Sequence, residues 1–331
     1  MHGQADMSDG IFKDNCITQV AATICALLGA GSLSEAGDAS SLSEAGDASS
    51  LSEAEGADKA SSALKASAAR PLSSVLTAAS SAFSGARCDR VFMYNPDAIA
   101  WWLYQKYKAY FAPLETGCVE AVRPLSKDSG ADKADAAFKA GGAPLMLEMC
   151  SVVPPKTPVC FASMYSGLTP EEHGIRKYEK PVLTVPTIFD ALPAAGKKVA
   201  IVSTAGDSIS LIFLNRPVDY FIYKTKQECN EKALELILED RYDVIVLYNG
   251  DYDYWMHRVT PTGFMARRAL RENISTYCTL RDAIAENWQQ HKTALAFAPD
   301  HGCHAKFGIP PGDHGEETAR DMNIAHWWSF L

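Results

Sequence analysis

The sequence lacks three features that would each indicate a particular class of protein. It has no block of basic residues, and its formal net charge at pH 7 is −9, so we do not expect a surface for duplex nucleic acid. Its longest apolar stretch, residues 17–30, is interrupted by polar side chains and is too short to span a bilayer. The first residues lack the basic segment of a secretion signal. These absences predict a protein that neither binds DNA nor crosses a membrane.

Closely spaced cysteine pairs are also absent. The nine cysteines are scattered, and none forms a Cys-x-x-Cys motif. In a chain of 331 residues this pattern favours reduced thiols over a disulfide framework. Together with the missing signal segment, it predicts a cytoplasmic location. What is present is the composition of a soluble globular protein, with 47% hydrophobic and 21% charged residues.

A repeat divides the chain into three parts. Residues 32–58 contain three copies of a nine-residue unit that begins Ser-Leu-Ser-Glu-Ala, and the Ala/Ser-rich character continues to about residue 86. Such a segment has too few large apolar residues to fold, so residues 31–86 are predicted to be a disordered linker. Residues 1–30 would form a helix packed on the core, and residues 87–331 a globular domain. A second Ala/Lys/Asp-rich patch, residues 130–142, is predicted to be an exposed insertion.

Short apolar runs alternate with amphipathic stretches in the globular domain. We expect strands at 90–94, 144–149, 198–202, 243–248 and 294–298, with weaker ones at 219–223 and 323–327. We expect helices at 98–111, 158–166, 187–195, 227–239 and 264–290. This alternation predicts an α/β fold, in which helices cover both faces of a mainly parallel sheet as a three-layer αβα sandwich.

Acids and histidines follow the ends of the predicted buried strands. In open α/β sheets, side chains beyond the carboxyl ends of the strands meet at one edge. Three carboxylates and three histidines there predict a two-metal site, built from Asp97, Asp253, His257, Asp300, His301 and His314. Oxygen and nitrogen ligands of this kind suit zinc, manganese or iron.

The choice between two neighbouring aspartates stays open in the sequence. Asp253 and His257 are four residues apart, which places them on one face of a helical turn. Asp251 competes for the same role. Such pairs are more often solvent-facing than ligands. The Asp300-His301-Gly302 turn is a stronger indication of a metal site, and its alternative is a turn capped by the aspartate without a metal.

Thr157 directly precedes the predicted helix 158–166 and has two interpretations. Followed by Pro158 and with Gly167 at the far end, it suits the N-cap position, which is the interpretation that local sequence favours. Alternatively, a hydroxyl at the positive end of a helix dipole can act as a nucleophile when a metal lowers its pKa.

The stretch from Thr157 to Ile175, ending Ser-Gly-Leu-Thr-Pro-Glu-Glu-His-Gly-Ile, resembles the type I phosphodiesterase/nucleotide pyrophosphatase branch of the alkaline phosphatase superfamily. The resemblance extends from about residue 89 to the C-terminus and implies that Thr157 is the nucleophile. It implies two divalent ions, commonly zinc. Asp253, His257 and His314 would hold one; Asp97, Asp300, His301 and the Thr157 hydroxyl would hold the other. The implied reaction is attack of Thr157 on phosphorus, followed by hydrolysis of the phosphothreonine.

Three departures from the family pattern concern the substrate. Where relatives carry a phosphate-binding asparagine, this chain has Tyr178, preceded by Arg176 and Lys177. Tyr178 or this basic pair would therefore have to bind the phosphoryl oxygen instead. The segment after His257 begins with Arg258 instead of a Gly-Pro turn. Only twelve residues separate His301 from His314, which predicts a minimal cap and an open site unless a second subunit closes it.

The resemblance therefore implies a hydrolase of small phosphate esters, with diesters as the expected class. A phosphonate hydrolase, a phosphomonoesterase or a phosphomutase on the same fold is the alternative, and a catalytically silent metal-binding relative is the rival from another class. A sulfatase is disfavoured, because the sequence contains no Cys-x-Pro-x-Arg motif.

Overall fold

A seven-stranded sheet forms the centre of the computed structural model, which describes residues 10–30, 70–85, 87–118 and 143–331. The strand order is β2-β9-β6-β1-β5-β3-β4. The strands are β1 Arg90–Pro96, β2 Leu145–Cys150, β3 Val199–Thr204, β4 Asp219–Tyr223, β5 Val244–Asn249, β6 Thr293–Phe297 and β9 Asn323–Phe330. Strand β9 is antiparallel to both of its neighbours, and the pairs among β6, β1, β5, β3 and β4 are parallel.

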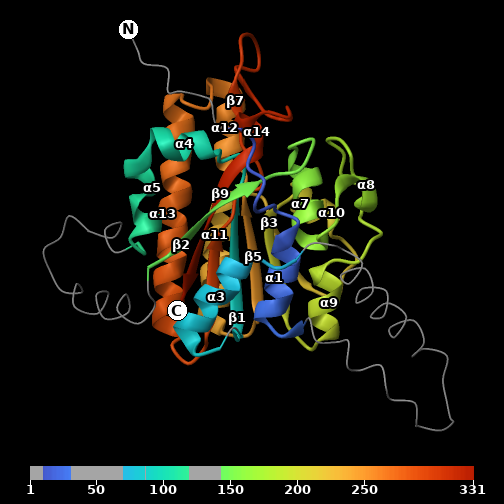
Figure 1. Ribbon diagram of the computed structural model, residues 1–331, viewed down its shortest axis with the longest axis vertical. Helices are drawn as coiled ribbons and strands as arrows, with labels where there is room; N and C mark the ends of the chain where they lie inside the picture. Colours follow the sequence, from blue (N-terminus) through green and yellow to red (C-terminus); the bar gives the residue numbers. More distant parts are fainter. Residues whose placement is uncertain (1–9, 31–69, 86, 119–142) are drawn as a thin grey trace, which may run out of the picture.

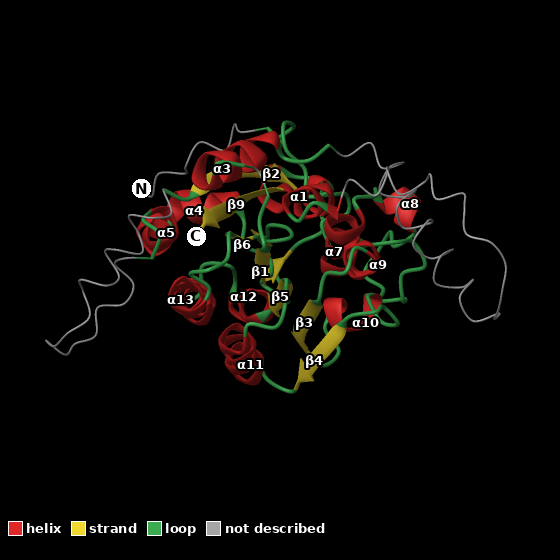
Figure 2. Ribbon diagram, turned by 90° about the horizontal axis from the view of Figure 1, so that it is seen from below, coloured by secondary structure: helices red, strands yellow, loops and turns green. Residues whose placement is uncertain are grey.

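Helices cover both faces of this sheet (Figures 1 and 2). One layer contains α1 Gln19–Leu27, α3 Ser73–Phe83, α7 Thr157–Ser166, α9 Ile188–Ala194 and α10 Ser208–Ile212. The other contains α4 Trp101–Lys106, α5 Lys108–Glu115, α11 Lys226–Glu239, α12 Asp251–Val259 and α13 Phe264–Asn287. Short helices α8 Pro170–His173 and α14 Ala319–Met322 and the hairpin of β7 His304–Ala305 and β8 Gly312–Asp313 complete the described elements.

Alternation of side chains along the strands creates the two cores. In β1, Val91 and Met93 belong to the core beneath α1 and α7, whereas Phe92 and Tyr94 belong to the core beneath α11 and α13. All four are fully buried, as expected for a strand covered on both faces. The predicted three-layer αβα sandwich with a mainly parallel sheet is confirmed, and its seven predicted strands lie where they were expected.

The predicted helix 98–111 is wrong as a single element. Ala98 adopts a left-handed conformation, with φ of 62°, so the helix begins only at Trp101. Tyr107 then leaves helical geometry, with φ of −122° and ψ of 39°, and divides the segment into α4 and α5. Amphipathic spacing continues across this break, which is why the sequence pattern does not reveal it.

The prediction of a disordered linker over residues 31–86 is wrong near the C-terminal end of that range. Residues 73–83 form α3, in which Val75 and Ala79 are fully buried against the core that α1 also covers. These two side chains are four residues apart and therefore share one helix face, which even a small-residue segment can bury. The repeat at 32–58 and the predicted insertion at 130–142 lie outside the described residues.

Helix α1 packs on the layer that carries α7. Val20 and Ile24 of α1 are fully buried in the core that they share with α7 and α9. The segment before α1 pairs with the end of β2, where the Ile17 N–H donates to the Cys150 carbonyl at 3.0 Å. The N-terminal helix thus supports the helix on which Thr157 lies.

The expectation of reduced thiols throughout is wrong for one pair. Cys118, after α5, forms a disulfide with Cys278 of α13 across 160 residues of sequence. The other seven cysteines are free. A contact between residues so far apart leaves no spacing motif, and disulfides are typical of oxidising compartments, so cysteine content does not support a cytoplasmic location. Within the described ranges, the structure contains no helix with the length and apolar character needed to span a bilayer.

Candidate metal centre and active site

Three neighbouring parallel strands deliver the predicted acidic residues to one edge of the sheet. Strands β6, β1 and β5 are adjacent in the strand order. Asp97 directly follows β1, α12 with Asp253 begins two residues after β5, and Asp300 follows β6. The carboxyl ends of parallel strands lie at the same edge, so residues as far apart in the sequence as Asp97 and Asp300 meet there.

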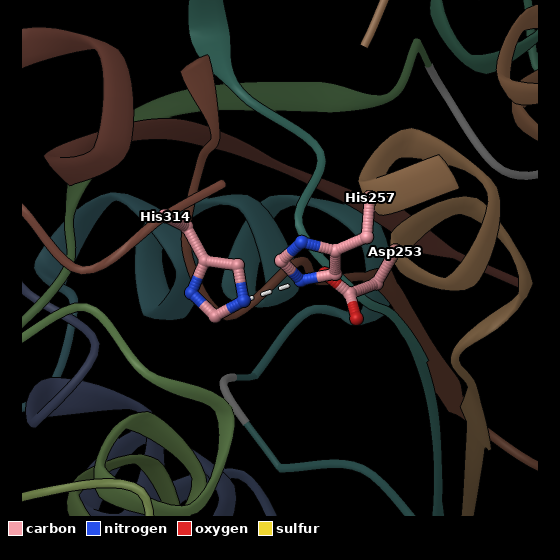
Figure 3. A group of neighbouring side chains, drawn as sticks. All are labelled: Asp253, His257 and His314. Carbon is pink, nitrogen blue, oxygen red and sulfur yellow. Dashed lines mark ion pairs between the residues drawn. The ribbon is translucent and has the colours of Figure 1, made fainter. Parts of the chain in front are cut away.

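Asp253, His257 and His314 form the first group (Figure 3). Asp253 and His257 project from successive turns of α12, and His314 approaches from the segment after β8. Asp253 Oδ1 lies 3.2 Å from His257 Nε2 and 3.4 Å from His314 Nε2. Asp251, the competing candidate, points elsewhere and forms an ion pair with Lys226.

Asp97, Asp300 and His301 form the second group, and their side chains are almost completely buried. His301 Nε2 lies 3.4 Å from Asp97 Oδ1 and 3.4 Å from Asp300 Oδ2. The two groups adjoin, because the rings of His301 and His314 stack with their centroids 4.1 Å apart. In both groups, the candidate ligand atoms lie within 4.8 Å of one another.

Thr157 is directed at the second group and does not cap its helix. The N-cap of α7 is Lys156, and no side chain caps this end. The Thr157 hydroxyl is 3.3 Å from Asp97 Oδ2, to which it donates, and 3.3 Å from His301 Nε2. The cap interpretation is therefore wrong: Thr157 is the first helical residue, where its side chain points out of the helix toward the carboxylates.

In their neutral form, the three histidines share one tautomer, in which Nε2 is unprotonated. In each ring, Nδ1 lies against a backbone carbonyl: that of Gly312 at 2.8 Å for His257, Gly302 at 2.9 Å for His301, and Pro155 at 2.9 Å for His314. A carbonyl accepts only, so Nδ1 carries the proton and Nε2 presents its lone pair to the aspartates. This arrangement is typical of metal-binding histidines.

The facing carboxylates also lack donors. Asp97 Oδ1, Asp253 Oδ1 and Asp300 Oδ2 are buried and have no hydrogen-bond partner. Buried charges of one sign are very unfavourable unless they are paired or coordinate a cation. Acceptors on the aspartates therefore meet acceptors on the histidines, and a divalent cation in each group would satisfy both. The residues fit metal ions.

The pKa shifts have the same physical origin. Burial, followed by the charge of Asp253, raises the pKa of Asp97 to about 7. Burial and the charge of Asp97 raise the pKa of Asp300 well above its ordinary range. Burial, followed by repulsion from His314, holds the pKa of His301 well below its ordinary value. Burial opposes ionisation of Asp253 too, but His257 and His314, when they are protonated, outweigh it and lower the pKa; the same contacts raise the pKa of both histidines.

A cavity of about 370 Å³ opens beside these groups, with Asp97, Thr157, Asp253 and His257 in its wall. Of the three predicted substrate-binding residues, Tyr178 also lines this cavity. Arg176 and Lys177 do not: Arg176 donates to the Glu171 carbonyl, and Lys177 pairs with Glu179 at 3.5 Å. The loop turns both side chains outward into solvent, a direction that sequence alone does not reveal.

The structure adds residues that sequence reasoning missed. The Tyr248 hydroxyl, at the end of β5, donates a hydrogen bond to Asp97 Oδ2. Its position at a strand end was the available signal. Lys180, Asp207, Lys226 and Arg258 also line the cavity. His173 lies apart from both groups, since its ring nitrogens contact Ser163 Oγ and the Ile175 N–H.

No protein-family model and no curated protein matches this chain. Among solved structures, murine ectonucleotide pyrophosphatase/phosphodiesterase 5 is similar with a TM-score of 0.46 and 16% identity, over 65% of this chain and 58% of that chain. Its human counterpart has a TM-score of 0.46 and 16% identity, over 65% and 57%. Phosphonoacetate hydrolase from Sinorhizobium meliloti 1021, in complex with phosphonoformate, has a TM-score of 0.44 and 17% identity, over 66% and 57%. The chain spans less than two thirds of the length of each.

Proposed function

We propose that this protein is a metal-dependent hydrolase of phosphate esters that uses Thr157 as its nucleophile. The observation that carries the proposal is the position of the Thr157 hydroxyl, 3.3 Å from both Asp97 Oδ2 and His301 Nε2 at the start of α7. This hydroxyl lies beside two groups of carboxylates and histidines whose facing atoms are hydrogen-bond acceptors and could bind metal ions. Phosphoryl transfer to a hydroxyl requires such a nucleophile next to positive charge.

Two divalent ions fit the two groups described above. Asp253, His257 and His314 would hold one; Asp97, Asp300, His301 and the Thr157 hydroxyl would hold the other. Zinc is the metal we propose, with manganese or iron as alternatives that the same ligands accept. When bound, the ions would supply positive charge that lowers the pKa of the hydroxyl and stabilises the negative oxygens around phosphorus.

The chain itself positions the reacting groups. Asp97 accepts the hydrogen bond of Thr157 and is held in turn by Tyr248, so the orientation of the nucleophile depends on β1 and β5 together. Thr157 lies at the start of the ten-residue helix α7, where the positive end of the helix dipole favours developing negative charge. Thr157 Oγ1 would bond to phosphorus as the ester oxygen leaves, and water would then hydrolyse the phosphothreonine and restore the hydroxyl.

We propose phosphodiesters as the first class of substrate, because the cavity continues beyond Thr157 and can accept a second substituent on phosphorus. A cavity of about 370 Å³ suits a small molecule. Phosphonates and monoesters are the alternative substrates on the same site.

Hydrolysis of bis-p-nitrophenyl phosphate and p-nitrophenyl phosphate, with zinc or manganese supplied, tests the proposal. Wild-type protein should hydrolyse the diester faster. Thr157→Ala should lose turnover by at least about a thousandfold, as expected for removal of a nucleophile, while metal analysis shows nearly unchanged content because six ligands remain. Near-normal turnover in the variant would show that Thr157 is not the nucleophile. Metal binding without turnover of either ester would favour a phosphonate hydrolase or a silent binding protein.

A further inference from the structure

The cavity beside Thr157 carries positive charge on the wall away from the two metal-binding groups. Lys180, Lys226 and Arg258 line it. Lys226 is neutralised, since it pairs with Asp251 and, at 3.6 Å, with Glu272. Within the part of the chain that the structure describes, Lys180 and Arg258 have hydrogen-bond and ring contacts but no ion pair. Neither of these two cations is therefore neutralised by a direct ion pair, although the charge of Lys180 acts on Asp207 and opposes the rise in pKa that burial causes there.

Each of these two cations is held in place by a tyrosine. The Arg258 guanidinium carbon lies 3.4 Å from the centre of the Tyr254 ring, and its Nη1 donates to the Tyr254 carbonyl at 2.8 Å. Lys180 Nζ lies 5.2 Å from the centre of the Tyr178 ring and donates to the Gly206 carbonyl at 2.8 Å. Both rings also line the cavity. Attraction to a ring face restrains a cation without neutralising it.

Donor capacity remains on both side chains. A guanidinium has five N–H donors and an ammonium three, and each side chain uses one on a carbonyl. Asp207, the remaining carboxylate of this wall, accepts hydrogen bonds from the hydroxyls of Thr204 and Ser203 instead. The free donors of Arg258 and Lys180 are thus available to a ligand in the cavity.

We infer that the substrate carries a second negatively charged group, a carboxylate or a further phosphate, which Arg258 and Lys180 bind while the reacting phosphorus lies at Thr157. The inference rests on the proposed function, which assigns Thr157 to the phosphorus. Arginine in particular binds planar or tetrahedral anions through paired N–H donors. Tyr178 and Tyr254 would flank the carbon skeleton that links the two charged groups. The substrate class is therefore a small dianionic or polyanionic phosphorus compound.

Binding of three phosphonates to the zinc-loaded full-length protein, measured by isothermal titration calorimetry, tests this inference. Methylphosphonate has no charged group besides its phosphonate. Phosphonoacetate carries a carboxylate in addition, and 2-aminoethylphosphonate carries an ammonium group. Wild-type protein should bind phosphonoacetate at least tenfold more tightly than methylphosphonate, and 2-aminoethylphosphonate no more tightly than methylphosphonate. Equal binding of phosphonoacetate and 2-aminoethylphosphonate would overturn the inference.

Variants separate the cationic wall from other causes of such a preference. Arg258→Gln and Lys180→Gln should each reduce the preference for phosphonoacetate over methylphosphonate by about threefold to tenfold, with Arg258→Lys intermediate. The control is Arg241→Gln, an exposed arginine that precedes β5 at the opposite edge of the sheet and pairs with Glu239; it should have no effect. A preference that survives in both cavity variants refutes the assignment.

These measurements distinguish failure of the anion-binding inference from failure of the proposed function. If the preference depends on Arg258 but no ester is hydrolysed, the anion-binding wall stands and the hydrolase proposal fails. If the esters are hydrolysed but phosphonoacetate has no advantage over methylphosphonate, the hydrolase proposal stands and this inference fails. Binding of none of the three probes by the zinc-loaded protein rejects the inference.

Discussion

Replacing Asp97 with asparagine tests the metal centre most directly, because its effect should change sign with the metal. Asp97 is 1% exposed. Its Oδ2 accepts from Tyr248 and Thr157, whereas Oδ1 has no donor and lies 3.4 Å from His301 Nε2. An asparagine amide has the same shape. Its oxygen can keep the Tyr248 bond, and its NH₂ can donate to the His301 lone pair, so the variant satisfies a contact that the carboxylate cannot.

The magnitude follows from the pKa. Burial, followed by the charge of Asp253, raises the pKa of Asp97 from 3.8 to about 7. A carboxyl with a raised pKa keeps a proton in the folded state that the unfolded chain has released. Stability is therefore lost as pH rises from about 4 to about 7. By pH 8 the loss is on the order of 4 kcal/mol, at about 1.4 kcal/mol for each pH unit. Asparagine does not ionise, so the variant does not lose this stability as the pH rises.

Urea unfolding with and without zinc measures both effects. In chelator at pH 8, Asp97→Asn should be more stable than wild type by up to about 4 kcal/mol, and at pH 4 the two should nearly coincide. With free zinc at a thousandfold excess over its Kd, wild type should gain about 4 kcal/mol, and the variant should gain much less. A metal-free variant that is less stable than wild type at pH 8 would refute the electrostatic reasoning. Equal stabilisation of both proteins by zinc would refute the ligand assignment.

Three further predictions concern packing, protons and the disulfide. Gly302→Ala should lower the free energy of unfolding by about 1–3 kcal/mol, because the added Cβ would overlap the Arg320 carbonyl and lie 2.9 Å from Ala100 Cβ. The control is Gly85→Ala, whose added Cβ has no atom within 4 Å; it should change the thermal midpoint of unfolding little. The rise in that midpoint on adding zinc should be smaller at pH 5.5 than at pH 8, because burial and the charge of Asp97 raise the pKa of Asp300 and protons then compete with the metal; a pH-independent rise would contradict this. Alkylation of the denatured, unreduced protein should modify seven of the nine cysteines. Loss of the Cys118–Cys278 disulfide in Cys118→Ser should lower the free energy of unfolding by up to about 5 kcal/mol for a loop of this length.

The central sheet and the convergence of the metal-binding candidates could be predicted from the order of residues alone. Buried strands in a parallel sheet appear as apolar runs, and their carboxyl ends meet at one edge whatever the distance along the chain. Asp97, Asp300 and His301 follow such runs directly, so their proximity could be predicted without coordinates. The spacing of Asp253 and His257 likewise follows from helical geometry alone.

The directions of neighbouring side chains, in contrast, depend on how the chain folds in three dimensions. Asp251 and Asp253 differ by two residues, yet α12 directs one to Lys226 and the other to His314. The same holds for Thr157, which turns away from its helix end, and for Tyr178, which faces the cavity while Lys177 does not. Side-chain direction, the Cys118–Cys278 pair and the burial of α3 all depend on contacts between segments far apart in the chain. Local pattern carries no information about such contacts, because their partners are set by how the layers pack.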